Sequence, residues 1–127
     1  MRRRFASGRV ARLATIGPDG APRLVPICFV LEGELIHSVV DAKPKRTQQL
    51  ARLAAVARDP RVAVLVDEWS EDWSRLWWVR ADGRARVTEP GPEVLAWLAA
   101  KYPQYRSAPP PGPALEITVE RWSGWTP

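Results

Sequence analysis

Apolar and polar residues alternate over short segments of this chain, and glycine or proline closes most of these segments. The segment 10–16 alternates in this way and ends at the sequence Gly-Pro-Asp-Gly of positions 17–20. Proline fixes one φ angle there and glycine permits a positive one, which is typical of a turn. A period of two places successive side chains on opposite faces of a strand, so the pattern predicts a mainly β protein with short antiparallel strands.

We expect strands at 10–16, 23–31, 34–40, 62–66, 76–80, 84–88 and 114–122. The first three would form an antiparallel meander, in which Pro26 confines its strand to an edge or a bulge because proline lacks an N–H donor. Asp82-Gly83 predicts a turn or a bulge between the fifth and sixth segments. The segment 62–66 is apolar throughout, which favours a strand buried on both faces.

The spacing of apolar residues changes to that of a helix in two longer segments, 47–58 and 92–102. Proline follows each apolar stripe and ends the helix. A short helix is expected at 2–8, with Phe5 as its one large apolar anchor. Six or seven strands, two or three short helices and no regular β–α–β alternation predict one antiparallel barrel domain over residues 1–127.

The size and charge of the chain limit the classes of partner that it can bind. A chain of 127 residues is one domain and is too short to enclose a large cleft alone, which favours an oligomer. The net charge of +5 suits an anionic partner such as nucleic acid, an anionic lipid surface or a phosphorylated cofactor. Cys28 is the single cysteine, and no segment approaches the ~20 apolar residues of a membrane span. We therefore expect a cytoplasmic protein.

Few residues of the sequence suit acid–base or metal chemistry. One histidine and one cysteine do not make a zinc site. The histidine, His37, has no accompanying Gly-x-Ser-x-Gly elbow and is interpreted as a half-buried structural residue. Cys28 is interpreted as a small buried apolar residue. We therefore name no catalytic residue and no metal ligand, and expect a bound cofactor to carry the chemistry.

A basic cluster of Lys43, Lys45 and Arg46 separates a predicted strand from the helix at 47–58. Together with the free N–H groups of a helix start, these side chains would make an anion site. The alternative is a solvated basic loop.

Tryptophan is abundant, with seven copies in the chain. Trp77 and Trp78 are adjacent on a predicted strand, so their side chains must point to opposite faces. One of them should be available for an interface or for stacking against a ring, unless both simply cover the core and the barrel rim.

The order and spacing of these motifs resemble those of pyridoxamine-phosphate-oxidase-like split barrels. The segment 11–30 (ARLATIGPDGAPRLVPICFV) is similar to the family's first hairpin. A strand, a basic cluster before a leucine-bearing helix, the sequence DPRV at 59–62 and an apolar strand follow in the family's order. The segment 79–89 resembles its "V-x-x-x-G-x-A-x-V" strand. The resemblance covers about residues 5–122, and the Trp77-Trp78 pair and the ending at 121–125 resemble actinobacterial members that use the deazaflavin coenzyme F420.

The resemblance implies an antiparallel split β-barrel (an FMN-binding split barrel) that forms a homodimer with two cofactor sites at the interface. It assigns Lys45 and Arg46, with Lys43, to the cofactor phosphate, Ser38 and Val39 to positions along the cofactor, and Thr15, Pro26 and Ile27 to the vicinity of its ring. The chain departs from the pattern at 47–49 (Thr-Gln-Gln), where relatives often have a further arginine and an asparagine. This departure leaves FMN as an alternative to F420.

The implied function is an oxidoreductase that moves a hydride between F420 and an electron-poor organic acceptor, such as a quinone-like, tetrapyrrole or nitroaromatic compound. The alternatives are an FMN-dependent oxidoreductase and a non-catalytic split barrel that binds a flavin or haem. A nucleic-acid-binding barrel is disfavoured, because the arginines are scattered instead of interleaved with exposed aromatic residues on one strand face.

Overall fold

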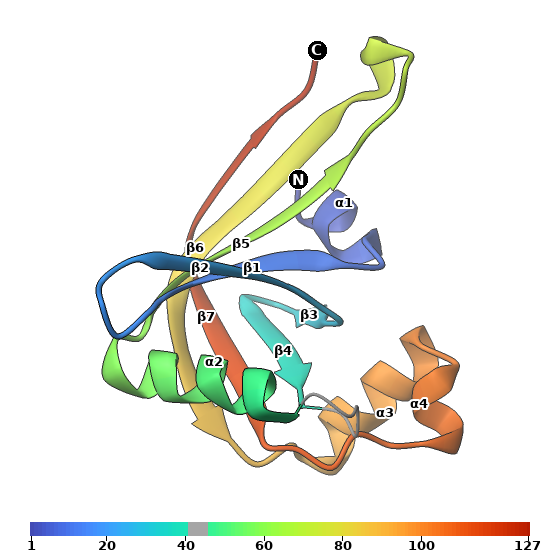
Figure 1. Ribbon diagram of the computed structural model, residues 1–127. Coiled ribbons are helices and arrows are strands. Elements are labelled where there is room, and N and C mark those ends of the chain that lie inside the picture. Colours follow the sequence, from blue (N-terminus) through green and yellow to red (C-terminus); the bar gives the residue numbers. More distant parts are fainter. Residues whose placement is uncertain (41–45) are drawn as a thin grey trace.

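The computed structural model describes residues 1–40 and 46–127, and for residues 46–50 it describes the helical backbone only. Seven described strands form one curled antiparallel sheet, a split barrel as predicted (Figure 1). The strands are β1 Ala11–Ile16, β2 Pro22–Ile27, β3 Val30–Glu32, β4 Leu35–Val39, β5 Arg61–Glu68, β6 Trp77–Thr88 and β7 Ala114–Trp125. The helices are α1 Arg2–Ser7, α2 Arg46–Arg58, α3 Pro92–Lys101 and α4 Gln104–Ser107, with a 3-10 turn, η1, at Trp73–Arg75.

The strand order is β2-β1-β5-β6-β7-β4-β3. β2 pairs with β1 and β3 pairs with β4, so the two halves of the predicted strand 23–31 lie at opposite edges of the sheet. The predicted three-stranded meander is therefore wrong. Pro26 does lie on an edge strand, where its missing N–H leaves no gap in a central ladder.

The break between β2 and β3 is held by two side chains at the end of α3. The backbone N–H of Phe29 donates to the Tyr102 hydroxyl at 3.1 Å, and Lys101 Nζ donates to the Phe29 carbonyl at 3.0 Å. The same hydroxyl donates to the carbonyl of Arg9 at 3.0 Å. Because these side chains bond the backbone of Phe29, the chain can leave one edge of the sheet without orphaning buried polar groups.

A single strand, β6, replaces the two strands predicted at 76–80 and 84–88. Its register with β7 shifts between Asp82 and Gly83, which confirms the bulge alternative. A Cβ atom on Gly83 would collide with the carbonyl oxygen of Thr118, so only glycine allows the two strands to approach so closely. The bulge therefore bends β6 without ending it.

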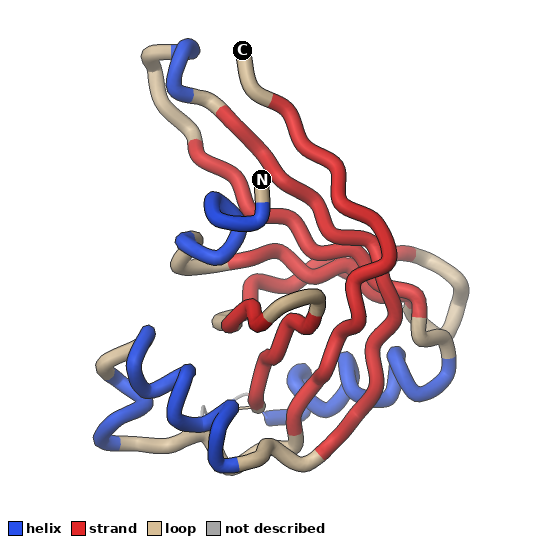
Figure 2. Tube along the Cα trace, turned by 180° about the vertical axis from the view of Figure 1, so that it is seen from behind, coloured by secondary structure: helices blue, strands red, loops and turns tan. Residues whose placement is uncertain are grey.

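The core lies on the inner face of the curled sheet. Phe5 of α1 is completely buried and meets Phe29 and Trp122 edge-on, at ring-centroid distances of 5.2 and 5.1 Å. Leu53 and Val56 of α2 join the same cluster. In Figure 2 the strands arch along one side of the molecule, and α1, α3 and α4 gather on the other.

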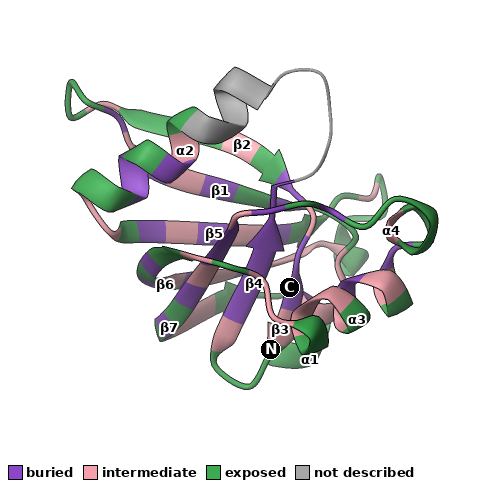
Figure 3. Ribbon diagram, turned by 90° about the horizontal axis from the view of Figure 1, so that it is seen from below, coloured by how far each residue is buried: buried purple, intermediate pink, exposed green. Residues whose placement is uncertain are grey.

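Burial alternates along β5 (Figure 3), which corrects the prediction of a strand buried on both faces. Val62, Val64 and Val66 face the core, whereas Ala63 and Leu65 on the opposite face are only half-buried. α1 and α2 cover the inner face, and nothing in the described chain covers the outer one at this strand. Apolar residues on both faces of β5 therefore leave an apolar outer surface.

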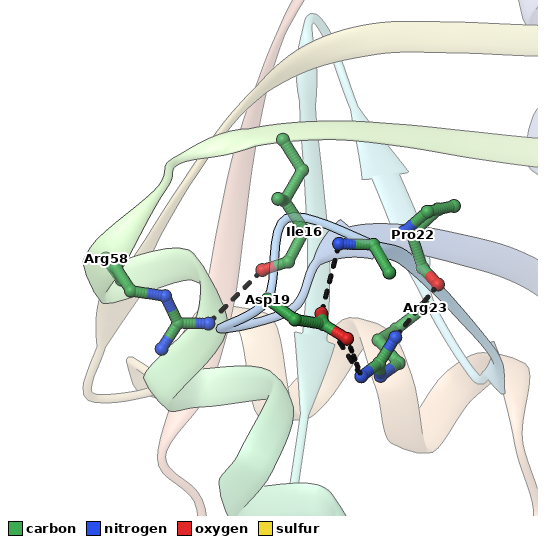
Figure 4. A network of polar contacts seen from close by, with 6 residues as sticks. Ile16, Asp19, Pro22, Arg23 and Arg58 are labelled. Atoms are coloured by element: carbon green, nitrogen blue, oxygen red, sulfur yellow. Dashed lines mark hydrogen bonds and ion pairs between the residues drawn. The ribbon is translucent and has the colours of Figure 1, made fainter.

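The hairpin between β1 and β2 is tied to the end of α2 (Figure 4). Asp19 accepts hydrogen bonds from the Ala21 amide at 3.0 Å and from Arg23 at 3.3 Å, and Arg58 donates to the Ile16 carbonyl at 3.3 Å. These contacts hold the turn predicted at 17–20 beside the helix.

The substitution Tyr102→Phe should lower the free energy of unfolding by about 1 to 3 kcal/mol, because it leaves a buried backbone amide without its acceptor. Urea unfolding measures the effect. Ser107→Ala removes an exposed hydroxyl and should change stability by less than about 0.5 kcal/mol. A Tyr102→Phe protein as stable as wild type would show that the break at Phe29 does not depend on this bond.

Candidate functional site

The outer face of β1, β2, β5 and β6 carries a cleft of about 590 Å³. Its lining is largely apolar, although Arg12 and Arg80 contribute to it. Leu24 is 71% exposed beside it, an unusual state for a leucine on a sheet. Four tryptophans line the cleft: Trp69, Trp77, Trp78 and Trp125.

Trp77 and Trp78 point to opposite faces of β6, as the alternation predicted. Trp77 packs against the inner core and also contributes to the lining of the outer cleft, whereas Trp78 is the register partner of Trp125 and lines this cleft with it. Two indole rings on adjacent strands make an aromatic wall that suits a planar ligand.

Two buried polar atoms on this part of the sheet lack hydrogen-bond partners among the described residues. They are Nε of Arg80 and Oγ of Ser123, which face each other in the register of β6 and β7. Arg80 Nε lies 3.1 Å from a carboxylate oxygen of Asp82, but without the geometry of a hydrogen bond. Arg80 lines the outer cleft with a half-exposed side chain and can present its guanidinium to a ligand there, whereas Ser123 is not part of the lining.

Ser38 lies beside the end of β2, whereas the side chain of Val39 points to the opposite face of β4. Ser38 is buried, and its hydroxyl donates to the Cys28 carbonyl at 2.8 Å, next to Ile27. Val39 belongs to the smaller cluster between β4 and α3, which also contains Leu98. Successive positions of a strand face opposite ways, so only one of these two side chains can contact any one ligand.

The three residues predicted to lie near a ring do not converge. Thr15 pairs with Arg23 and Ile27 pairs with Ala11, at opposite ends of the β1–β2 ladder. Thr15 and Ile27 are both buried, whereas Pro26 is exposed. A role of all three side chains at one ring therefore stays a prediction, and Pro26 is the one open to solvent.

The predicted phosphate residues lie at the start of α2. Lys43 and Lys45 fall outside the described residues, and Arg46 is the first residue of α2, of which the backbone alone is described. The helix predicted at 47–58 is confirmed as Arg46–Arg58, 13 residues long. Phosphate binding by these three side chains stays a prediction.

His37 is buried on the α3 side of β4, with 6% of its surface exposed. Its ring lies 6.0 Å from the ring of Trp97, and burial lowers the pKa of the imidazole despite the nearby Glu116 and Glu32. The histidine is more deeply buried than the half-buried position expected, and it does not line the outer cleft. Within the described residues, no group of three or more His, Cys, Asp or Glu side chains could hold a metal ion.

Lys101 and Tyr102 are the residues that sequence reasoning missed. Lys101 Nζ donates to the carbonyls of Ala6 and Phe29 and lies 3.8 Å from the Phe29 ring centroid. Burial, and then the charge of Arg9, lower the pKa of Lys101 to about 8. Their partners lie 72 to 95 residues away in sequence, so no local pattern could have found them.

A curled seven-stranded antiparallel sheet with this strand order defines the class of split barrels. The sequence agrees with this class, because the profile of pyridoxamine 5'-phosphate oxidase matches residues 1–126. The chain belongs to the pyridoxamine 5'-phosphate oxidase family.

Three solved structures illustrate the range of similar proteins. A conserved hypothetical protein from Mycobacterium tuberculosis is 25% identical, with a TM-score of 0.73 over 98% of this chain and 81% of the other. An F420 reductase is 17% identical, with a TM-score of 0.67 over 96% and 94% of the two chains. HutZ, a haem storage protein from Vibrio cholerae, is 14% identical, with a TM-score of 0.71 over 98% and 90%.

The curated proteins contain no significant match to this sequence. None of the helices in the described part of the chain is long and apolar enough to cross a membrane.

Burial of His37 predicts that stability falls as the pH drops below about 6.5. The unfolded chain takes up a proton there while the folded protein resists it, because its pKa is lowered. The contribution is complete above the unfolded pKa and is lost on acidification. Urea midpoints at about pH 7.5 and about pH 5.5 measure it, and His37→Gln should flatten the difference. An equal pH dependence in both proteins would assign it to other groups.

Proposed function

We propose that this protein is a homodimeric, cytoplasmic oxidoreductase that transfers a hydride between the deazaflavin F420 and an electron-poor organic acceptor. The observation that carries the proposal is the outer cleft, where an aromatic wall stands beside the half-exposed guanidinium of Arg80. Membership of a flavin-binding family and the structural similarity to an F420 reductase support the choice of cofactor.

The cleft fits a flat ring with one polar edge. Trp78 and Trp125 offer an apolar surface for stacking, while the half-exposed guanidinium of Arg80 can donate hydrogen bonds. Ligand sites of proteins commonly combine an apolar lining with a few such polar groups.

The basic residues at the start of α2 are the proposed phosphate ligands. Lys45 and Arg46, with Lys43 beside them, precede or begin a helix of 13 residues, whose first N–H groups have no partner within the helix. Ser38 on β4, with its neighbour Val39, would then lie along the cofactor. Pro26 on β2, with its neighbour Ile27 and with Thr15 on β1, would lie near the ring.

The bound deazaflavin would supply the hydride, and the chain would bind, orient and exclude water. His37 is buried against Trp97 and is not proposed as an acid or a base. A hydride donor depends on close stacking and on a dry site more than on a proton relay, so the apolar cleft matters most.

A second copy would complete this site. Leu24 is 71% exposed on the outer face, next to Ala14, Ala63 and Leu65, which line the same cleft. An exposed apolar surface of this kind is typical of protein interfaces. Pairing of two copies through it would cover the cleft and keep water from the ring.

FMN binding and a haem-binding module are the alternatives. Structural similarity to the haem storage protein HutZ favours the second at the level of the fold. His37 is the only histidine, and it is buried against Trp97, so haem ligation by histidine would require α3 to move. This burial makes the oxidoreductase the better-supported proposal.

The charge reversals Lys45→Glu and Arg46→Glu should each weaken F420 binding by about ten- to a hundredfold, the worth of one charge-assisted phosphate contact. Calorimetric titration of the coenzyme measures the effect. Arg75→Glu makes the same change of charge on the exposed turn η1 and should leave affinity unchanged.

Stopped-flow oxidation of reduced F420 by a panel of quinone, tetrapyrrole and nitroaromatic acceptors extends the same test. Tight FMN binding without F420 affinity would select the FMN alternative, and tight binding of either cofactor without turnover would select the binding module. Unchanged titration by both variants would contradict the phosphate site.

Leu24→Glu should convert the dimer to a monomer, because it places a charge in the proposed apolar interface. Sedimentation equilibrium at micromolar concentration distinguishes one chain mass from two. Val87→Glu is the control, since Val87 is also exposed but does not line the outer cleft. A monomeric wild-type protein would contradict the proposed dimer.

A further inference from the structure

A second and larger cleft, of about 1090 Å³, lies between α1 and the far ends of β6 and β7. One side consists of three consecutive arginines of α1, Arg2, Arg3 and Arg4, and the other carries Trp78, Trp122 and Trp125. The proposed cofactor site does not use these arginines. Trp78 and Trp125 contribute to the lining of both clefts.

The positive charge of this cleft is only partly compensated. Arg2 forms an ion pair of 2.6 Å with Glu34, and the other carboxylate oxygen of Glu34 accepts a hydrogen bond of 3.0 Å from Trp122 Nε1. Neither Arg3 nor Arg4 forms an ion pair with a described residue. The guanidinium carbon of Arg4 lies 5.6 Å from the centroid of the Trp77 ring. Among the described residues that line the cleft, none is acidic. Two guanidinium groups therefore face this space without a counterion.

The tryptophans define the shape of a suitable ligand. The planar guanidinium group forms two or more hydrogen bonds with carboxylate or sulfonate oxygens, and indole rings stack on flat aromatic systems. Neither a small inorganic anion nor an uncharged aromatic molecule would use both halves of the lining.

We propose that this cleft binds a planar aromatic anion, a compound with a fused or conjugated ring system and a carboxylate or sulfonate group. Arg3 and Arg4 bind its negative group, and the tryptophans bind its ring. The further statement that this compound is the hydride acceptor rests on the proposed function, and its basis is that Trp78 and Trp125 line both clefts.

Binding of a matched pair of probes to the cofactor-free protein tests the inference. Anthraquinone-2-sulfonate carries the negative group, and 2-(hydroxymethyl)anthraquinone has the same rings without it. Calorimetry should give at least about tenfold tighter binding of the sulfonate, the effect of one charge-assisted contact. Arg3→Gln and Arg4→Gln should each remove most of this preference and leave the neutral probe unchanged.

Glu34→Gln provides a test in the opposite direction. The amide oxygen can still accept the hydrogen bond from Trp122, but the charge that compensates Arg2 is gone. Binding of the sulfonate should therefore become several-fold tighter, a result that a purely structural role of these residues does not predict.

Arg75→Gln is the control, because it removes the same charge from η1, outside the cleft. Equal affinity for the two probes, no binding of either, or an equal loss in Arg75→Gln would overturn the inference. These titrations contain no F420, so their failure is distinct from a failure of the proposed function, which appears in the coenzyme titration.

Discussion

The hydrogen bonds between Phe29 and the end of α3 organise this molecule. An uninterrupted strand from β2 into β3 would keep both on one edge of the sheet and give a flat meander. The amide and carbonyl of Phe29 bond instead to Tyr102 and Lys101. At residues 28 and 29 the chain crosses from β2, at one edge of the sheet, to β3, at the opposite edge. This crossing converts the sheet into a split barrel.

This crossing determines which surface stays open. Phe5 and α2 cover the inner face, and α3 packs behind β3 and β4, where Val30, Val39 and Leu98 form a separate cluster. The outer face of β1, β2, β5 and β6 receives no cover of this kind. Leu24, Trp78 and Trp125 are consequently left beside a cleft, where an isolated barrel would have placed polar residues.

The two clefts beside the paired strands β6 and β7 differ in the side chains that line them. Trp78 pairs with Trp125 across β6 and β7, and both residues line the two clefts. Arg80 lines the outer cleft, and the arginines of α1 line the second one. A neutral ring with a polar edge suits the first surface, and an anionic ring suits the second.

The sequence by itself determined the local elements: the turn at 17–20, the helices at 47–58 and 92–102, an irregularity at 82–83 and the opposite orientations of Trp77 and Trp78. These features follow from the spacing of apolar residues and from the φ angles that proline and glycine allow, which act over a few residues. The order of family motifs also gave the fold class. The break at Phe29, the separation of Thr15 from Ile27 and the meeting of α1 with the β6–β7 arm were decided only by the tertiary structure. Each depends on residues that are distant in the chain, such as Lys101 and Ala6, which are 95 residues apart. The local spacing of apolar residues carries no information about such contacts.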